Sequence, residues 1–459
     1  MNRPSGSTGE LQVVLMVLAV AWLVPAGPGM AATATQPASA PFNFEEASRN
    51  VPKPRELYPL VMRDMVAMDL SIVSDEIVAS DTEPKKRLRK ITGRFHSLEL
   101  ENQKWFHSFV IFTPADDSLS EGNQRRAKAV IVAGPCAVAH PAHVSLYGEP
   151  IAARTGYPTM IMAGLGVYAE GGEREVDIAV LERMRKKTGK DYYNMNCQLA
   201  LVYMRAMDVL EKTLGFDAVK TVIGGHSKWG RSATVAAAMD SRVAGVVIMG
   251  NESVYRTDQI QWHLSFHHAF FQEQVDVPVL YIGATNEGGY KMFNVNLMQE
   301  RLKRPMTIEL IPNYHHSNFD EKQYLDFMMW VSHVFDGRPI TRITEPRHER
   351  RDRVNVYQAK IESEAKIRLV RAWYVYATNA TWSDLMWYDW LMEKRGDHYE
   401  ARVPGAMPDA FLIEVADTAR GIPGYVTSLP QKLTDAPVIE RDPNKAGWMG
   451  PPDRQKESR

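Results

Sequence analysis

The stretch from Thr221 to Ala233 constrains the fold of this 459-residue chain more than any other. A run of β-branched and small residues ends in Gly224-Gly225-His226, Ser227 comes next, and a run of small residues follows from Ser232 to Met239. This pattern predicts a strand, a sharp turn with a serine at its tip, and a helix. A glycine at position 225 allows the close approach of facing backbone. We therefore expect the serine hydroxyl to project above the end of a sheet.

A serine in this setting is the nucleophile elbow of an α/β-hydrolase. The backbone N–H of Lys228 would lie at a helix N-terminus and point at the oxyanion that forms during attack on a carbonyl. The pattern here is G-x-S-x-x-G and not the usual G-x-S-x-G, because Trp229 stands in the glycine position and Gly230 follows one residue later. A serine in a glycine-rich turn of another α/β fold is the alternative interpretation.

A nucleophilic serine needs a base, and the base needs a carboxylate that orients it. In α/β-hydrolases the chain order is serine, acid, histidine. Glu287 lies at the end of an apolar strand predicted within 277–290, and His316 at the end of another within 306–317. Ligands gather at the carboxyl edge of a parallel sheet. The sequence therefore predicts a Ser227-Glu287-His316 triad.

Both partners have a competitor nearby in the sequence. Glu252 follows the strand predicted over 243–250 and competes with Glu287 for the role of the acid. His315 competes with His316 for the role of the base. We prefer His316 because the loop resembles the common N-Y-G-H-S form, with His315 in the glycine position.

A second oxyanion donor is expected in the loop after the strand predicted over 129–135. Pro135 has no N–H, so Cys136 or Ala137 would supply the donor beside Lys228.

The order of predicted elements indicates the fold class. Strands alternate with helices, which favours a parallel sheet behind a leading antiparallel hairpin. The expected strands are 91–101, 104–114, 129–135, 157–166, 243–250, 277–290 and 306–317, and the expected helices include 197–216 and 324–335. We predict an α/β-hydrolase with a mostly parallel central sheet, a cap insertion and a small C-terminal β-sandwich-like module.

The composition changes along the chain and predicts its domain boundaries. The apolar run over 11–24 is shorter than the ~20 residues that span a bilayer, and small residues follow it, as in a signal peptide. The expected parts are a signal peptide at 1–34, the hydrolase domain at 42–335 with an aromatic-rich cap insertion at 253–276, a linker at 336–364, the β-rich module at 365–430 and a disordered tail at 442–459. This organisation predicts a secreted or periplasmic protein without stable membrane insertion after signal cleavage.

The net charge of −1 gives no electrostatic basis for binding nucleic acid. The basic cluster over 85–90 is expected to be a solvated loop. Two cysteines, Cys136 and Cys197, provide no disulfide framework, and we expect two free buried thiols. His263 and His267 have the spacing of metal ligands on a helix but lack a glutamate between them, so we expect no metal and no cofactor.

The motifs together resemble the PhoPQ-activated pathogenicity-related protein family, a branch of the α/β-hydrolases. The resemblance comprises the elbow form G-x-S-K-x-G, the segment Asp240 to Val243, Thr285 to Glu287, Pro312-Asn313, and a tryptophan-containing β module. That family usually has Asp at the position of Glu287, and its elbow commonly has K-R-G where this chain has K-W-G. The elbow is also similar to that of glucuronoyl and acetyl-xylan esterases. The resemblance implies export and a serine-hydrolase core.

The residues and the resemblance predict a serine hydrolase that cleaves a small-molecule ester, with a carbohydrate-linked ester favoured by the esterase-like elbow and the aromatic cap. The alternative is a non-catalytic secreted binding or signalling protein on the same scaffold.

Overall fold

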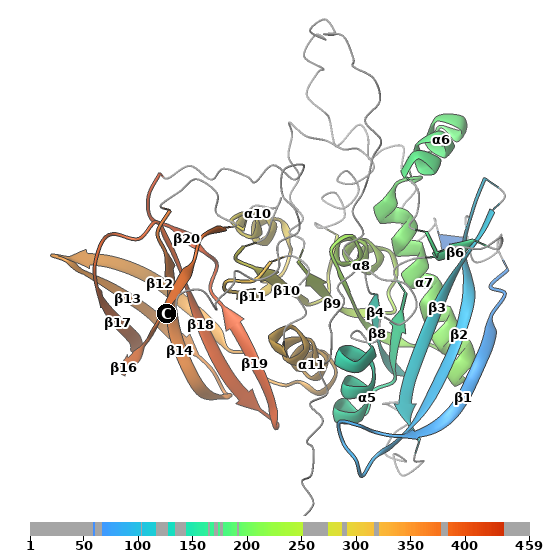
Figure 1. The fold of residues 1–459 in the computed structure, drawn as a ribbon, viewed down its shortest axis with the longest axis horizontal. Helices are drawn as coiled ribbons and strands as arrows, with labels where there is room; N and C mark the ends of the chain where they lie inside the picture. Colours follow the sequence, from blue (N-terminus) through green and yellow to red (C-terminus); the bar gives the residue numbers. More distant parts are fainter. Residues whose placement is uncertain are drawn as a thin grey trace, which may run out of the picture.

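The computed structural model describes residues 58–59, 67–101, 103–115, 127–133, 144–163, 166–168, 173–174, 178–190, 192–250, 274–286, 292–315, 321–377 and 384–435. Within these residues a large mixed sheet lies between helices, and two antiparallel sheets follow it (Figure 1). Figure 1 shows the two C-terminal sheets at one end of the molecule and the antiparallel strands of the hairpin at the other.

The large sheet has the order β1-β2-β3-β5-β4-β8-β9-β10-β11, and β6 and β7 pair beside β3. Its strands are β1 (Ser71–Ala79), β2 (Arg87–Leu100), β3 (Gln103–Pro114), β4 (Lys128–Ala133), β5 (Thr159–Met162), β6 (Gly166–Tyr168), β7 (Glu173–Arg174), β8 (Lys220–His226), β9 (Val243–Met249), β10 (Val279–Ala284) and β11 (Thr307–Ile311). Every neighbouring pair from β5 to β11 is parallel, whereas β1, β2 and β3 pair antiparallel. The mostly parallel sheet and the leading hairpin are thus confirmed.

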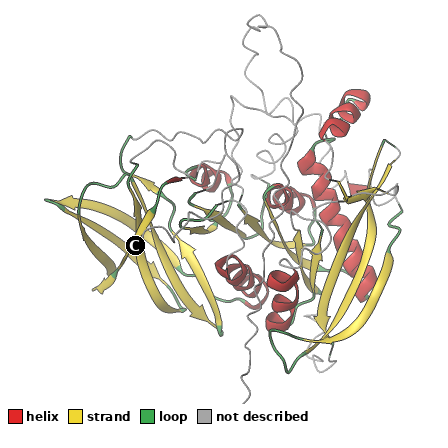
Figure 2. Ribbon diagram, in the orientation of Figure 1, coloured by secondary structure: helices red, strands yellow, loops and turns green. Residues whose placement is uncertain are grey.

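Helices cover both faces of the parallel strands (Figure 2). They are α5 (Glu149–Thr155), α6 (Ile178–Thr188), α7 (Met195–Leu214), α8 (Lys228–Met239), α10 (Asn294–Arg301) and α11 (Glu321–Asp336), with a π-helical turn, η3 (Val144–Gly148), before α5. Alternate strand residues point to opposite faces. Ile131 and Ile223 pack with α7 and α8, whereas their neighbours Val130 and Val222 pack with α5 and α11. Burial on both faces explains why these strands are continuous apolar runs.

Helix α7 is fixed at both ends by capping. The side chain of Asn194 accepts a hydrogen bond from the backbone N–H of Cys197 at 3.0 Å, and Gly215 ends the helix with a φ of 70°. Cys197 is a buried free thiol, and burial raises its pKa to about 12. Cys136, the other cysteine, lies outside the described residues.

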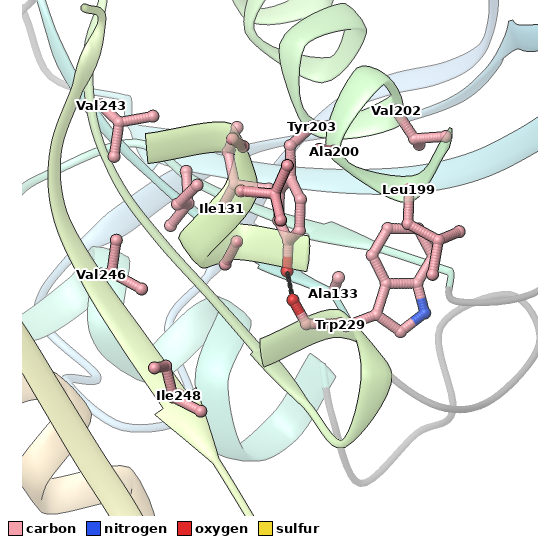
Figure 3. Close-up of a cluster of buried hydrophobic side chains, with 14 of the residues drawn as sticks. Ile131, Ala133, Leu199, Ala200, Val202, Tyr203, Trp229, Val243, Val246 and Ile248 are labelled. Atoms are coloured by element: carbon pink, nitrogen blue, oxygen red, sulfur yellow. Dashed lines mark hydrogen bonds between the residues drawn. The ribbon is translucent and has the colours of Figure 1, made fainter. Parts of the chain in front are cut away.

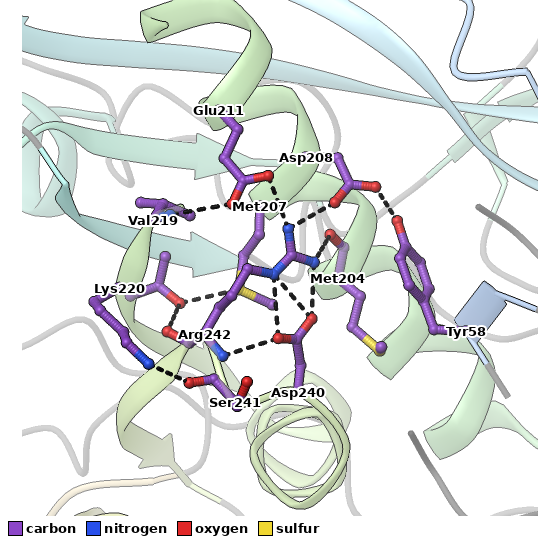
Figure 4. A network of polar contacts seen from close by, with 11 residues as sticks. Tyr58, Met204, Met207, Asp208, Glu211, Val219, Lys220, Asp240, Ser241 and Arg242 are labelled. Carbon is purple, nitrogen blue, oxygen red and sulfur yellow. Dashed lines mark hydrogen bonds and ion pairs between the residues drawn. The ribbon is translucent and has the colours of Figure 1, made fainter. Parts of the chain in front are cut away.

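An ion-pair network joins α7 to the turn before β9 (Figure 4). The guanidinium of Arg242 contacts Asp208 at 2.7 Å, Glu211 at 3.1 Å and Asp240 at 2.8 Å. All four side chains are largely buried, so water screens these contacts less than it would at the surface. The network fixes the loop between α8 and β9 against α7.

The basic segment that we expected to be a solvated loop begins strand β2. Arg89 makes a bidentate contact with Asp75 of β1, and Lys90 lies 3.7 Å from Glu76. The prediction of a loop was wrong from Arg87 onward. Arg89 and Lys90 face acidic residues of β1, an edge strand that the sequence analysis missed.

The C-terminal module consists of two antiparallel sheets, ordered β12-β13-β17-β16 and β15-β14-β18-β19 with β20 beside β18. Its strands are β12 (Arg342–Arg351), β13 (Val354–Glu362), β14 (Lys366–Val375), β15 (Trp387–Leu391), β16 (Glu393–Arg395), β17 (His398–Pro404), β18 (Ala410–Ala419), β19 (Ile422–Thr427) and β20 (Gln431–Lys432). The expected linker at 336–364 therefore contains two strands. β12 is highly charged because it is an exposed sheet edge, with Glu345 paired to Lys360 at 2.9 Å.

The module covers the β11 edge of the large sheet. The side chain of Thr427 accepts a hydrogen bond from the backbone N–H of Leu310 at 3.0 Å. The fully buried Arg338, which follows α11, pairs with Asp417 of β18 in the module. Both hydrophobic clusters of the domain built on the large sheet continue into the module, through Trp387 on one side and Ile413 on the other.

Several predicted segments fall outside the described residues: the signal peptide at 1–34, most of the cap insertion at 253–276, and the tail at 442–459. Among the helices that are described, none has the length and apolar character needed to cross a bilayer.

Candidate active site

Ser227 occupies the tip of a strained turn between β8 and α8. Its φ of 58° and ψ of −124° lie in a region that residues with a side chain rarely adopt. The backbone N–H of Ser227 donates to the carbonyl of Met249 at 2.8 Å, which holds the turn against β9. The residue is partly exposed between the buried His226 and Trp229. The predicted strand, turn and helix around this serine are therefore confirmed.

The two glycines of the motif allow tight packing around the turn. A Cβ at Gly225 would lie 2.5 Å from the Cβ of Trp229 and 2.5 Å from the hydroxyl of Tyr203. A Cβ at Gly230 would lie 2.8 Å from the carbonyl oxygen of Gly225 and 3.0 Å from Ile248. The glycine that lets α8 pack against the sheet is thus the one at position 230. This explains why the spacing G-x-S-x-x-G forms an elbow.

Trp229, the residue that departs from the usual motif, is completely buried, and its ring packs from α8 against α7 beside Leu199 (Figure 3). Its ring meets Tyr203 edge-on at 5.4 Å and His107 edge-on at 5.9 Å. The hydroxyl of Tyr203 donates to the carbonyl of Gly224 at 2.9 Å and lies 3.3 Å from the carbonyl of Trp229. The side chain of Tyr203 therefore contacts the backbone on both sides of Ser227.

Neither Tyr203 nor His107 was singled out in the sequence. Burial raises the pKa of Tyr203 well above its usual value, so the phenol keeps its proton. Burial lowers the pKa of His107 to about 4, partly offset by its Nδ1 bond to the carbonyl of Ala163 at 2.8 Å. Both groups are neutral at physiological pH and act here through packing and hydrogen bonding.

Lys228 is the first residue of α8, so its backbone N–H belongs to the helix N-terminus beside Ser227. Backbone N–H groups at this end of a helix have no partner within the helix and favour negative charge. This is the position expected of an oxyanion donor. The other two candidates, Cys136 and Ala137, lie outside the described residues.

The loops after β10 and β11 are joined to each other. The backbone N–H of Asn286 donates to the carbonyl of Tyr314 at 3.0 Å, and that of Asn313 donates to the hydroxyl of Thr285 at 2.9 Å. The Nδ1 atom of His315 lies 2.9 Å from the carbonyl oxygen of Asn286 and must donate to it, because that oxygen only accepts. The described part of each loop ends one residue before a predicted triad member.

Glu287, His316 and Glu252 lie outside the described residues, as do His263 and His267. Of the predicted catalytic set, the structure therefore describes Ser227, Lys228 and His315. In the described part of the chain, no three His, Cys, Asp or Glu side chains gather in a way that would hold a metal ion.

No protein-family model matches the chain, and no curated protein matches it, so the resemblance to the PhoPQ-activated family stays a prediction. Among solved structures, an acetyl xylan esterase from Paenibacillus sp. R4 is 12% identical, with a TM-score of 0.43 over 64% of this chain and 100% of that one. A cold-adapted esterase from an Arctic intertidal metagenomic library is 16% identical, with a TM-score of 0.38 over 58% and 99%. A glucuronoyl esterase from Solibacter usitatus is 13% identical, with a TM-score of 0.38 over 58% and 86%.

The strand order gives the fold of the chain itself. When β6 and β7, which lie off the main order, are left out, the strands from β2 onward lie in the order β2-β3-β5-β4-β8, so β4 and β5 exchange places. Ser227 directly follows β8, the fifth strand of this series. By this order and by its elbow, the chain has the α/β-hydrolase fold.

Proposed function

We propose that this protein is a serine hydrolase that cleaves a carboxylic ester through an acyl-enzyme, with Ser227 as nucleophile, His316 as base and Glu287 as the acid. The observation that supports this most is the backbone of Ser227, held at a positive φ at the carboxyl end of β8. Strain of this kind at a partly exposed serine is typical of a nucleophile elbow.

The reaction follows from the roles of these groups. The Oγ atom of Ser227 attacks the ester carbonyl while His316 takes its proton. The tetrahedral oxyanion accepts hydrogen bonds from the N–H of Lys228 and from a donor at Cys136 or Ala137. The intermediate expels the alcohol, which receives the proton from the imidazolium, and water then releases the acid by the reverse sequence.

The contacts of His315 support His316 as the base. In a triad the acid accepts from Nδ1 of the catalytic histidine. In His315 this atom already donates to the carbonyl of Asn286. This contact makes His315 the weaker candidate and favours His316 for the role of the base. For the acid we retain Glu287, because the residue before it, Asn286, is bonded to the histidine loop.

The substrate class and location belong to the same proposal. The elbow sequence and the aromatic composition of 253–276 favour an ester linked to a carbohydrate, and the first 34 residues favour export to the periplasm or beyond. We also propose membership of the PhoPQ-activated pathogenicity-related family. N-terminal sequencing of the exported protein should begin after Ala32 or Ala34; a protein that retains Met1 would contradict cleavage.

A fluorophosphonate probe tests the enzymatic proposal. The folded protein should be labelled, and Ser227→Ala should abolish labelling. Ser232→Ala is the matched control, because its hydroxyl is buried and donates to the carbonyl of Lys228 at 2.8 Å. Absence of labelling in folded wild-type protein would contradict the hydrolase and favour the non-catalytic binding protein.

A further inference from the structure

The C-terminal module contacts the hydrolase domain directly at the loop after β11. The side-chain amide of Asn313 donates to the carbonyl of Trp387 at 2.9 Å, and the backbone N–H of Trp387 donates to the Oδ1 atom of Asn313 at 2.7 Å. One side chain thus pairs with both backbone groups of a residue 74 positions away, as a neighbouring strand would. Asn313 has a φ of 60° and is buried.

The loop after β10 is bonded to the same segment of the module. The side-chain amide of Asn286 donates to the carbonyl of Leu385 at 2.7 Å. The Oδ1 atom of Asn286 accepts from the hydroxyl of Thr285 at 2.7 Å, and that hydroxyl accepts from the backbone N–H of Asn313. The two loops and residues 385–387 therefore form one connected hydrogen-bond network.

The segment that bridges the loops is itself held firmly. Leu385 and Trp387 are 4% and 2% exposed and belong to the hydrophobic cluster that also contains Tyr281 of β10 and Leu310 of β11. Buried hydrogen bonds in such surroundings are costly to leave unmade. The segment cannot leave the loops without opening this core.

We propose that residues 385–387 act as a brace that fixes both catalytic loops, and that Asn286 and Asn313 are the positioning residues of that brace. This inference rests on the proposed function, because Glu287 and His316 follow Asn286 and His315 in the chain. The module is then part of the active-site architecture. Misplacement of a catalytic group by 1 Å can cost about 100-fold in rate, so the brace is expected to act on turnover.

Two variants remove the brace contacts. Asn313→Gly removes the amide but keeps the positive φ, which glycine adopts without strain. Asn286→Ala removes the contacts to Leu385 and Thr285. Asn296→Ala is the matched control, because Asn296 of α10 also bonds the module, at the carbonyl of Pro430 at 3.2 Å, but lies on neither catalytic loop.

Steady-state kinetics on an activated ester, expressed per folded molecule, should separate the roles. We expect kcat to fall about 10-fold or more in Asn313→Gly and Asn286→Ala, as for a loosened catalytic geometry, with KM within about two-fold. The rate of fluorophosphonate labelling should fall in parallel, and the acid limb of the pH profile of kcat/KM should move, because the histidine is less well held by its carboxylate. Asn296→Ala should keep wild-type kcat and pH profile.

Wild-type kcat and pH profile in both loop variants would overturn the brace while the hydrolase proposal stands. If Asn313→Gly fails to fold, Asn286→Ala alone decides in the same way. If the folded wild-type protein is not labelled and cleaves no ester, the proposed function fails first, and the brace fails with it.

Discussion

Tyr203 of α7 donates its hydroxyl hydrogen to the carbonyl of Gly224, three residues before Ser227 in β8. The same hydroxyl lies 3.3 Å from the carbonyl of Trp229, two residues after the serine. A helix that begins 32 residues before Ser227 thus contacts the backbone on both sides of it.

Removal of this hydroxyl should slow the reaction of Ser227. In Tyr203→Phe the ring still packs against Trp229, but the carbonyl of Gly224 loses its hydrogen bond from the Tyr203 hydroxyl. We expect kcat to fall about 10-fold with an unchanged KM, since loss of precise positioning affects the rate of reaction. Tyr157→Phe is the control, because its buried hydroxyl donates to Asp336 far from the elbow. Equal kcat in both variants would show that the Tyr203 hydroxyl does not position the elbow.

Gly230→Ala should disturb the packing of α8. The added methyl would lie 2.8 Å from the carbonyl oxygen of Gly225, and the helix must shift to relieve this contact. Overpacking of this kind costs about 1–3 kcal/mol in the free energy of unfolding. Urea denaturation should show the loss, and probe labelling of Ser227 should slow. Wild-type stability would mean that α8 accommodates the methyl without strain.

Substitution of the two candidate acids should identify the triad member. We expect Glu287→Gln to lower kcat by about 10⁴-fold, as loss of a triad carboxylate does, because the wrong tautomer of the histidine is then favoured. Glu252→Gln should retain activity within a few-fold. The reverse result in ester turnover would transfer the acid role to Glu252.

Substitution should also show which of the two adjacent histidines, His315 or His316, is the base. His316→Ala should lose turnover and probe labelling. His315→Ala should lose only the hydrogen bond to the carbonyl of Asn286 and keep measurable turnover. Loss of labelling in His315→Ala, with retention in His316→Ala, would reverse the assignment.

The junction between α11 and the module should make stability depend on pH. Burial raises the pKa of Asp326 well above its usual value, and the charge of Glu309 raises it further. Bonding to the N–H of Tyr425 and the charge of Lys322 oppose this, while Glu414 adds to it. Because the folded-state pKa exceeds the unfolded one, the folded state binds more protons. The contribution of Asp326 to the free energy of unfolding is therefore fully present below the ordinary aspartate pKa of about 4. It is lost as the pH rises through the pKa of the folded state.

Asp326→Asn should weaken that decline, because an amide still accepts from Tyr425 and has no proton to lose. Thermal melts from acidic to alkaline pH should show a flatter dependence in the variant. Parallel curves for the two proteins would mean that Asp326 does not titrate in this range.

The elements that the sequence predicted well are those whose pattern is local. Helix α7 shows apolar spacing and a glycine at its end, and β8 shows a buried run before Gly225. Strands β1 and β12 were missed because their charged side chains find partners on the neighbouring strand, which no local pattern reveals. The serine of the site was evident from its glycine context. The contacts of Tyr203, Asn286 and Asn313 were not evident, because their partners lie 21, 99 and 74 residues away.

The way β19 and residues 385–387 close over the β11 edge has a thermodynamic consequence. Both apolar clusters run through the boundary between the α/β-hydrolase-fold domain and the module, and the buried Arg338–Asp417 pair lies at that boundary. Opening either part therefore exposes apolar surface of the other. Heat should therefore unfold both parts in one cooperative transition. A chain that ends after α11 would expose the unpaired edge of β11 to solvent.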